Sequence, residues 1–160
     1  TQVTTVEKPM VVDQAFTKQL KELLTPYFKI EEALVASDAK SASAQTSAFN
    51  TALKNVDMGL LKGDAHMKWM DQLKSLETAT KLISSATDVD VQRAAFSQLT
   101  NALYSSIKTF GVNGLEAYYQ FCPMAFDNKG AFWISDKKEI SNPYFGEQML
   151  RCGETKEILK

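Results

Sequence analysis

The chain has 160 residues, 44% of them hydrophobic and 23% charged, a composition typical of one folded globular domain. Its 18 basic and 19 acidic residues leave a net charge of −1, which excludes a strong field for attracting nucleic acid. No apolar run reaches the roughly 20 residues that span a bilayer, so we expect no transmembrane segment. We predict a single domain over residues 1–160, with a helical bundle at 13–111 and a tail at 115–160.

Apolar side chains recur at steps of three and four in four stretches of the predicted bundle, as in amphipathic helices. The first stretch begins after Asp13 and continues to Leu34. Pro26 interrupts it, so either a new helix starts with Pro26 in its first position or one helix continues with a kink.

Three further stretches complete the predicted bundle, and an aspartate that we predict as the N-cap precedes each of them. They are residues 42–60 after Asp38, residues 65–83 with Asp64 and residues 96–110 after Asp88. Gly111 is expected to end the last helix. Because the links are short, neighbouring helices should be antiparallel, and we predict an up-and-down bundle of about four helices.

The tail differs from the bundle because it holds both cysteines and many aromatic residues. Residues 116–121 and 131–135 have the length and aromatic content of short strands, with a turn signal at residues 128–130 between them. We therefore predict a mainly α protein whose tail forms a small β-hairpin or irregular cap on the bundle.

Common catalytic motifs are missing from the sequence. It contains no phosphate-binding glycine loop, no Gly-x-Ser-x-Gly, no Cys-x-x-Cys and no His-Glu-x-x-His. His66 is the only histidine, and no local pattern supports a pair of it with either cysteine as a nucleophile and base. We predict that the protein is not an enzyme, although a bundle core can hold dispersed carboxylates.

Sulfur-containing residues and the single histidine form three short groups. They are Cys122 with Met124, Met149 with Cys152, and His66 with Met70. The first pair points the same way if its segment is extended, and the other two share a face on a helical turn. Thiolate and thioether ligands select Cu(I). If the tail folds onto the third helix, these groups can meet as one soft-metal site.

Each group also has an ordinary structural interpretation. Methionine fills irregular cores, and a lone histidine is usually structural or solvent-facing. Cys122 and Cys152 can form a disulfide that closes a loop of about 30 residues, a stabilisation of roughly 3–4 kcal/mol. They can equally be metal ligands or free thiols, and their number does not decide between these three states.

Several motifs carry a resemblance to a known family. In the tail they are YQFCPMA at 119–125, AFWIS at 131–135, ISNPYFG at 140–146 and MLRCG at 149–153, and in the bundle DMGLL at 57–61, HMKWM at 66–70 and VQRAAF at 91–96. Over residues 14–155 the chain resembles an uncharacterised domain family of mostly Bacteroidetes-type bacteria. Such domains occur alone as secreted proteins or lipoproteins, and also attached to periplasmic adaptors of copper/silver-type heavy-metal efflux pumps.

The resemblance implies metal handling outside the cytoplasm but no particular activity. Recurrent positions of the family match His66, Cys122, Met124, Met149 and Cys152. The Cys-Pro-Met segment is also similar to the Cys-Pro-Met-His segment of small heavy-metal-binding domains, but Ala125 stands where that histidine would be.

From these observations we predict a non-catalytic, periplasmic or otherwise extracytoplasmic domain that binds Cu(I) or another soft metal ion. The predicted ligands are Cys122, Cys152, Met124, Met149, His66 and Met70. A periplasmic efflux adaptor or a metal donor or acceptor protein is the expected partner. The start at Thr1 is compatible with a processed signal peptide or a trimmed chain. The alternative is a structural or interaction module with a Cys122–Cys152 disulfide.

Overall fold

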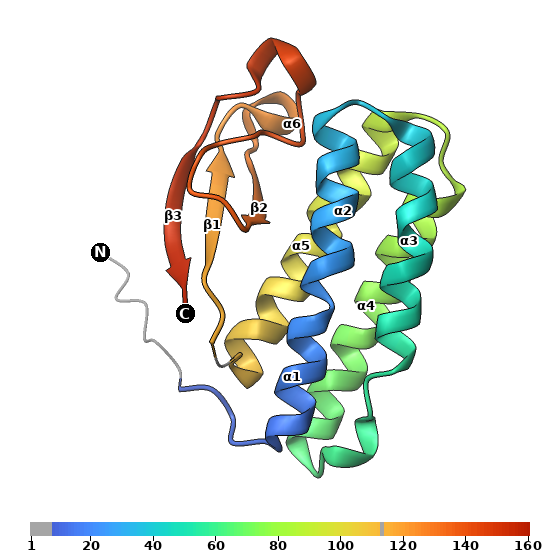
Figure 1. Ribbon diagram of the computed structural model, residues 1–160, viewed down its shortest axis with the longest axis vertical. Helices are drawn as coiled ribbons and strands as arrows, with labels where there is room; N and C mark the ends of the chain where they lie inside the picture. The colour runs from blue at the N-terminus through green and yellow to red at the C-terminus, as the bar shows by residue number, and fades with distance from the viewer. Residues whose placement is uncertain (1–7, 113) are drawn as a thin grey trace.

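The computed structural model describes residues 8–112 and 114–160. In this part of the chain an antiparallel helical bundle stands beside a small antiparallel sheet (Figure 1). The bundle helices are α1 (Gln14–Glu22), α2 (Leu24–Val35), α3 (Ala39–Lys54), α4 (Asp64–Ser85) and α5 (Val89–Phe110). The structure thus confirms the predicted fold class. Among these helices, none combines the length and the apolar character that a membrane crossing requires.

The first apolar stretch forms two helices, α1 and α2, that follow one another along the same side of the bundle (Figure 1). Asp13 caps α1 by accepting a hydrogen bond from the amide of Ala15 at 2.8 Å. The joint at Leu23 keeps helical angles, with φ −66° and ψ −25°. Pro26 is the third residue of α2 and has no N–H to continue the ladder. The structure therefore has a second helix, as the first alternative predicts, but that helix begins at Leu24 and not at Pro26.

Two of the three other predicted N-caps are confirmed. Asp38 accepts a hydrogen bond from the amide of Ser41 at 3.0 Å, and Asp88 accepts one from the amide of Asp90 at 2.7 Å. Asp64 is not a cap but the first residue of α4, where its charge favours the positive end of the helix dipole.

Glycine residues set two of the remaining helix ends, and α3 is shorter than predicted. Gly63 precedes α4 with φ +59°, and Gly111 ends α5 with φ +74°, a region that favours glycine. Helix α3 ends at Lys54 rather than near residue 60, because Met58–Leu60 form a 3₁₀ turn.

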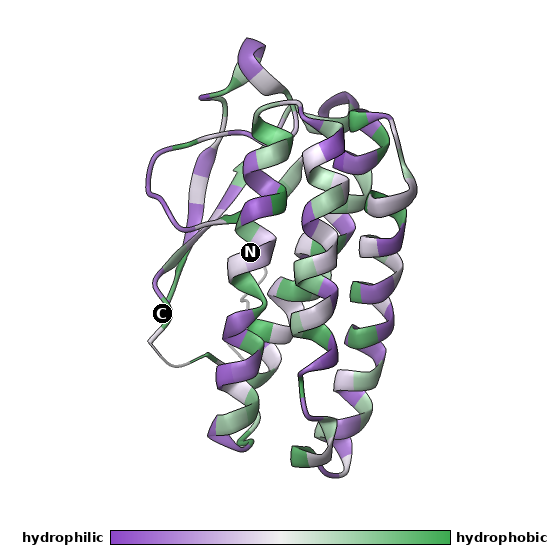
Figure 2. Cartoon of the chain, turned by 45° about the vertical axis from the view of Figure 1, so that its right-hand side comes forward, coloured by the Kyte–Doolittle hydropathy of each residue, from purple (hydrophilic) through white to green (hydrophobic). Residues whose placement is uncertain are grey.

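Aromatic side chains fill the core at both ends of the bundle. At one end Phe16 lies edge-on to Trp69 and Phe110, with ring centroids 5.3 and 5.0 Å apart. At the other end Tyr27 stacks on Phe96 at 4.9 Å. Hydrophobic and hydrophilic residues alternate along each helix, so every helix buries one side (Figure 2).

The tail forms a three-stranded sheet in the order β2-β1-β3. Its strands are β1 (Ala117–Cys122), β2 (Ala131–Ser135) and β3 (Glu154–Leu159). The predicted hairpin of β1 and β2 is confirmed. Strand β3 was not expected, because its charged sequence lacks the aromatic signal of the other two.

Strand β2 is the sheet edge nearest the bundle (Figure 1). The amide of Ile134 donates a hydrogen bond to the hydroxyl of Tyr27 on α2 at 3.0 Å. Arg93 of α5 donates from Nε to the carbonyl of Pro143 at 2.7 Å and from Nη2 to that of Leu34 at 2.9 Å. The tail is therefore held by α2 and α5, and not by the helix that carries His66.

Candidate functional site

The structure brings the two cysteines together at the end of the sheet. Strand β1 ends at Cys122, and Phe121 pairs with Glu154 at the start of β3, so the chain enters β3 beside Cys122. Both cysteines are free, and their thiols lie close enough for Cys122 to raise the pKa of Cys152. Cys122 is fully buried, whereas Cys152 is half-buried. We call these two residues the thiol pair.

Gly153 allows the close approach of the two segments. Its φ is +141°, and a Cβ at this position would lie 2.9 Å from Cη2 of Trp133 and 3.0 Å from the carbonyl oxygen of Phe121. A larger residue would push the segment away from β1 and separate the thiols.

Asn142 fixes the backbone on the other side of the thiol pair. Its buried side chain donates a hydrogen bond to the carbonyl of Cys152 at 2.9 Å and accepts one from the amide of Tyr144 at 2.8 Å. The backbone amide of Asn142 donates a hydrogen bond to the carbonyl of Leu150 at 2.7 Å. The position of Cys152 is therefore set by a buried polar residue and a glycine.

The surroundings of the thiol pair favour the protonated form of Cys152. Burial, the neighbouring charge of Cys122 and the hydrogen bond with Cys122 all raise the pKa of the Cys152 thiol. A soft metal ion binds the thiolate form, so binding between the two sulfurs must release protons.

The two tail methionines differ in their relation to the thiol pair. Met149 ends a 3₁₀ turn, Gly146–Met149, and its carbonyl accepts a hydrogen bond from the amide of Cys152 at 3.0 Å. This is the helical-type turn on which the two side chains were expected to share a face. Met124 is 46% exposed and follows a turn rather than an extended segment, so its predicted alignment with Cys122 is wrong.

His66 and Met70 lie far from the thiol pair. Both are near the start of α4, where Trp69 between them packs 6.3 Å from Phe110 at the C-terminal end of α5. Asn142, which binds the carbonyl of Cys152, precedes Pro143, whose carbonyl is bound by Arg93 near the opposite end of α5. A 22-residue helix is about 33 Å long. The expectation of one site for all six side chains is therefore wrong.

Residues 23–114 match the family described as a protein of unknown function, DUF3347. The chain belongs to this family. The DUF3347 match covers more than half of the chain, from the joint of α1 and α2 to the end of α5. It is narrower than the predicted resemblance over 14–155, and the thiol pair lies beyond it. No curated protein and no solved structure matches the chain.

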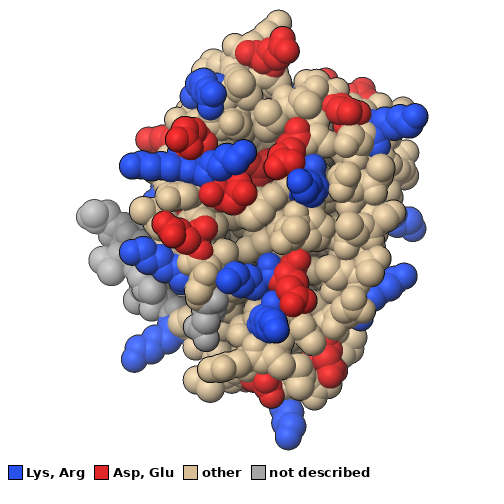
Figure 3. Space-filling view, viewed as in Figure 1, with Lys and Arg blue, Asp and Glu red and all other residues tan. Residues whose placement is uncertain are grey.

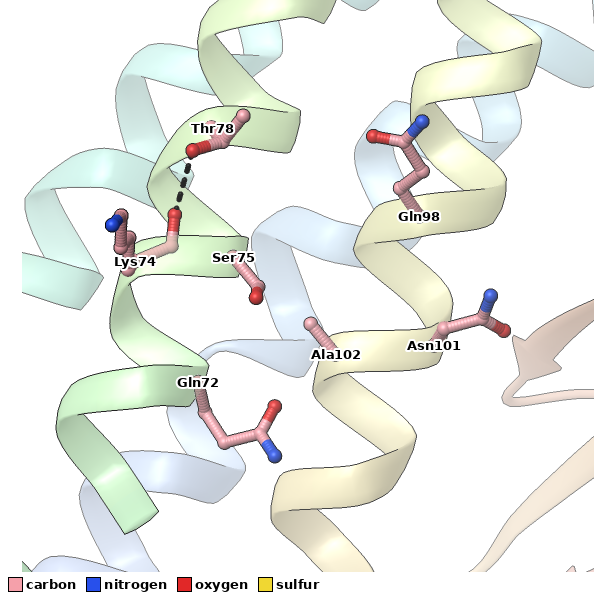
Figure 4. A pocket seen from close by; sticks show the side chains of 7 residues that line it. All are labelled: Gln72, Lys74, Ser75, Thr78, Gln98, Asn101 and Ala102. Carbon is pink, nitrogen blue, oxygen red and sulfur yellow. Dashed lines mark hydrogen bonds between the residues drawn. The ribbon is translucent and has the colours of Figure 1, made fainter. Parts of the chain in front are cut away.

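A hollow of about 540 Å³ lies between α4 and α5, away from the thiol pair. Figure 4 shows Gln72 of α4 and Gln98 of α5 pointing across it toward the facing helix. Lys74 is its one ionisable lining residue, so the hollow holds no acid–base pair. Among the residues that the structure describes, no group of three or more His, Cys, Asp or Glu side chains can hold a metal ion.

Three polar residues of the site region were not singled out from the sequence. They are Glu31, Arg93 and Asn142, and all three are buried. Glu31 had a detectable signal, because it lies four residues after Tyr27 on the apolar side of its helix. The bonds of Arg93 to Pro143 and of Asn142 to Cys152 reach main-chain carbonyls distant in sequence, so no sequence signal marks these contacts.

Charged residues do not mark a further site on the face seen in Figure 3. Lysine and arginine side chains there are interspersed with aspartate and glutamate. This agrees with the net charge of −1.

Proposed function

We propose that this DUF3347 protein binds one soft metal ion, of the Cu(I) type, between the thiolates of Cys122 and Cys152. The observation that supports the proposal is the nearness of these two free thiols, which strand pairing brings together from positions 30 residues apart (152 − 122 = 30). Two thiolates in a largely buried position suit a soft ion of low coordination number and exclude hard cations, which prefer oxygen ligands.

The surroundings of the thiol pair suit reversible binding. Cys122 is fully buried, and the half-buried Cys152 gives an ion access from solvent. Met149 is the available third ligand, because it lies one turn before Cys152. Met124 is two residues after Cys122 and 46% exposed, so its thioether is accessible to an ion in solvent.

The biological role that follows is a non-catalytic carrier or accessory domain in metal efflux outside the cytoplasm. A periplasmic efflux adaptor, or another protein that donates or accepts the metal, is the proposed partner. This part of the proposal rests on the resemblance of the tail motifs to domains that occur beside such adaptors.

A second candidate function has its own support in the same geometry. Oxidation of the thiol pair would join the end of β1 to the segment that leads into β3 and staple the sheet. The protein would then be a structural or interaction module whose sheet is stabilised by the disulfide.

An anaerobic Cu(I) titration of the reduced protein against a chromogenic competitor separates the two functions. We expect one tight equivalent, and a loss of at least about 100-fold in affinity for Cys122→Ser/Cys152→Ser, since even second-shell changes cost about 10–100-fold. His66→Ala is the matched control and should bind as the parent does. Equal affinity of the double variant would refute the metal site, and a thiol count showing a persistent disulfide would favour the staple.

A further inference from the structure

Glu31 is a buried acid that the proposed metal site does not use. It lies on α2, is only 7% exposed, and its Oε2 has no hydrogen-bond partner among residues 8–112 and 114–160. Burying an unpaired carboxylate is costly, so the neutral acid is the stable form in this position. Ionisation of this carboxyl group therefore destabilises the structure around it.

The groups around Glu31 come from both the bundle and the tail. They are Tyr27 and Glu32 of α2, and, from the link between β2 and β3, Asp136, Lys137 and Tyr144. Burial raises the pKa of Glu31, the carboxylates of Asp136 and Glu32 raise it further, and Lys137 lowers it, with a net shift well above the usual value.

A hydrogen bond that joins β2 to α2 lies close to Glu31. Tyr27, one helical turn before Glu31, accepts the amide hydrogen of Ile134 at 3.0 Å and pairs with Thr100 at 2.8 Å. Tyr144 donates its hydroxyl hydrogen to the carbonyl of Phe132. A negative charge on Glu31 would thus form inside the contact between α2 and the tail, close to Asp136.

We propose that Glu31 is a pH-sensitive latch, which holds the tail on α2 as a neutral acid and loosens it when the carboxyl group ionises. In the docked state the neutral form is favoured, whereas in a released tail water solvates the carboxylate. Docking therefore weakens as pH rises through the pKa of the docked state. The latch concerns only the docking of the tail and stands whether or not the thiol pair binds metal.

Two buried tryptophans allow a direct test. Trp133 lies in β2 and Trp69 in α4, and both are fully buried. In protein labelled with 5-fluorotryptophan, we expect the ¹⁹F resonance of Trp133 to shift or broaden with one midpoint in the range above the usual glutamate pKa. The resonance of Trp69 should stay constant, which makes it an internal reference.

Two variants assign the transition. Glu31→Gln should abolish the Trp133 transition, whereas Glu32→Gln, at the exposed neighbouring position, should keep the transition with a lower midpoint. Asp136→Asn gives a second test that leaves Glu31 in place, and it should lower the midpoint because one carboxylate is removed. A Trp133 transition that persists in Glu31→Gln, or a parent protein without any transition in this range, would overturn the proposal.

Discussion

Crosslinking the thiol pair is the perturbation whose size follows most directly from the structure. The pairing of Phe121 with Glu154 already places the two backbone segments side by side, so we expect a disulfide to need little movement of the backbone. It would close a loop of 30 residues (152 − 122 = 30). The chain-entropy model then predicts a loss of about 12 cal/mol/K in the unfolded state, or about 3.7 kcal/mol at 25 °C. For a chain of this size that corresponds to a rise of about 7–15 °C in Tm.

Urea unfolding of the reduced and the oxidised protein measures this difference. Cys122→Ser is the control, because the same oxidant should leave its unfolding free energy unchanged. The reasoning would be refuted if mild oxidation gave no intramolecular disulfide, or if the oxidised protein were no more stable than the reduced one. Either result would mean that β1 and the segment before β3 do not meet as described.

Three further predictions concern the contact between the tail and the bundle. Tyr27→Phe should lower the free energy of unfolding by about 1–3 kcal/mol in urea, because the buried amide of Ile134 loses its acceptor. The free energy of unfolding, measured by urea titrations at several pH values, should fall as pH rises from the usual glutamate pKa, about 4.3, to the raised pKa of folded Glu31. Glu31→Gln should remove this decrease in the free energy of unfolding. Gly153→Ala should cost at least about 1 kcal/mol and slow disulfide formation under mild oxidation, since its Cβ would lie 2.9 Å from Trp133.

The sequence predicts the bundle well because its helices carry local signals. Asp38 and Asp88 cap helices by bonds to amides two or three residues away, and such bonds depend on neighbouring residues alone. Apolar periodicity marks the buried side of each helix in the same local way. The error at Asp64 is small, because an aspartate is favourable both as a cap and in the first turn.

The candidate site could be predicted only in part, because it depends on contacts between distant segments. The sequence places Cys122 at a strand end and Cys152 before a glycine, but the pairing of β1 with β3 is what brings them together. Strand β3 lacks the usual signal, so this pairing was not foreseen. Likewise, every helix has an apolar side, and periodicity does not say which helices the tail covers. The hydrogen bonds of Arg93 and Tyr27 to the tail show that the tail covers α2 and α5. His66 lies at the other end of the bundle from Arg93.

X-ray absorption at the copper edge tests the central claim most directly. Reduced protein loaded with one equivalent of Cu(I) should show two thiolate sulfur neighbours, with at most one further sulfur from Met149 and no nitrogen. Loading should fail in Cys122→Ser/Cys152→Ser. A nitrogen neighbour from His66, or the same spectrum from the variant without thiols, would contradict the assignment of the thiol pair as the metal site.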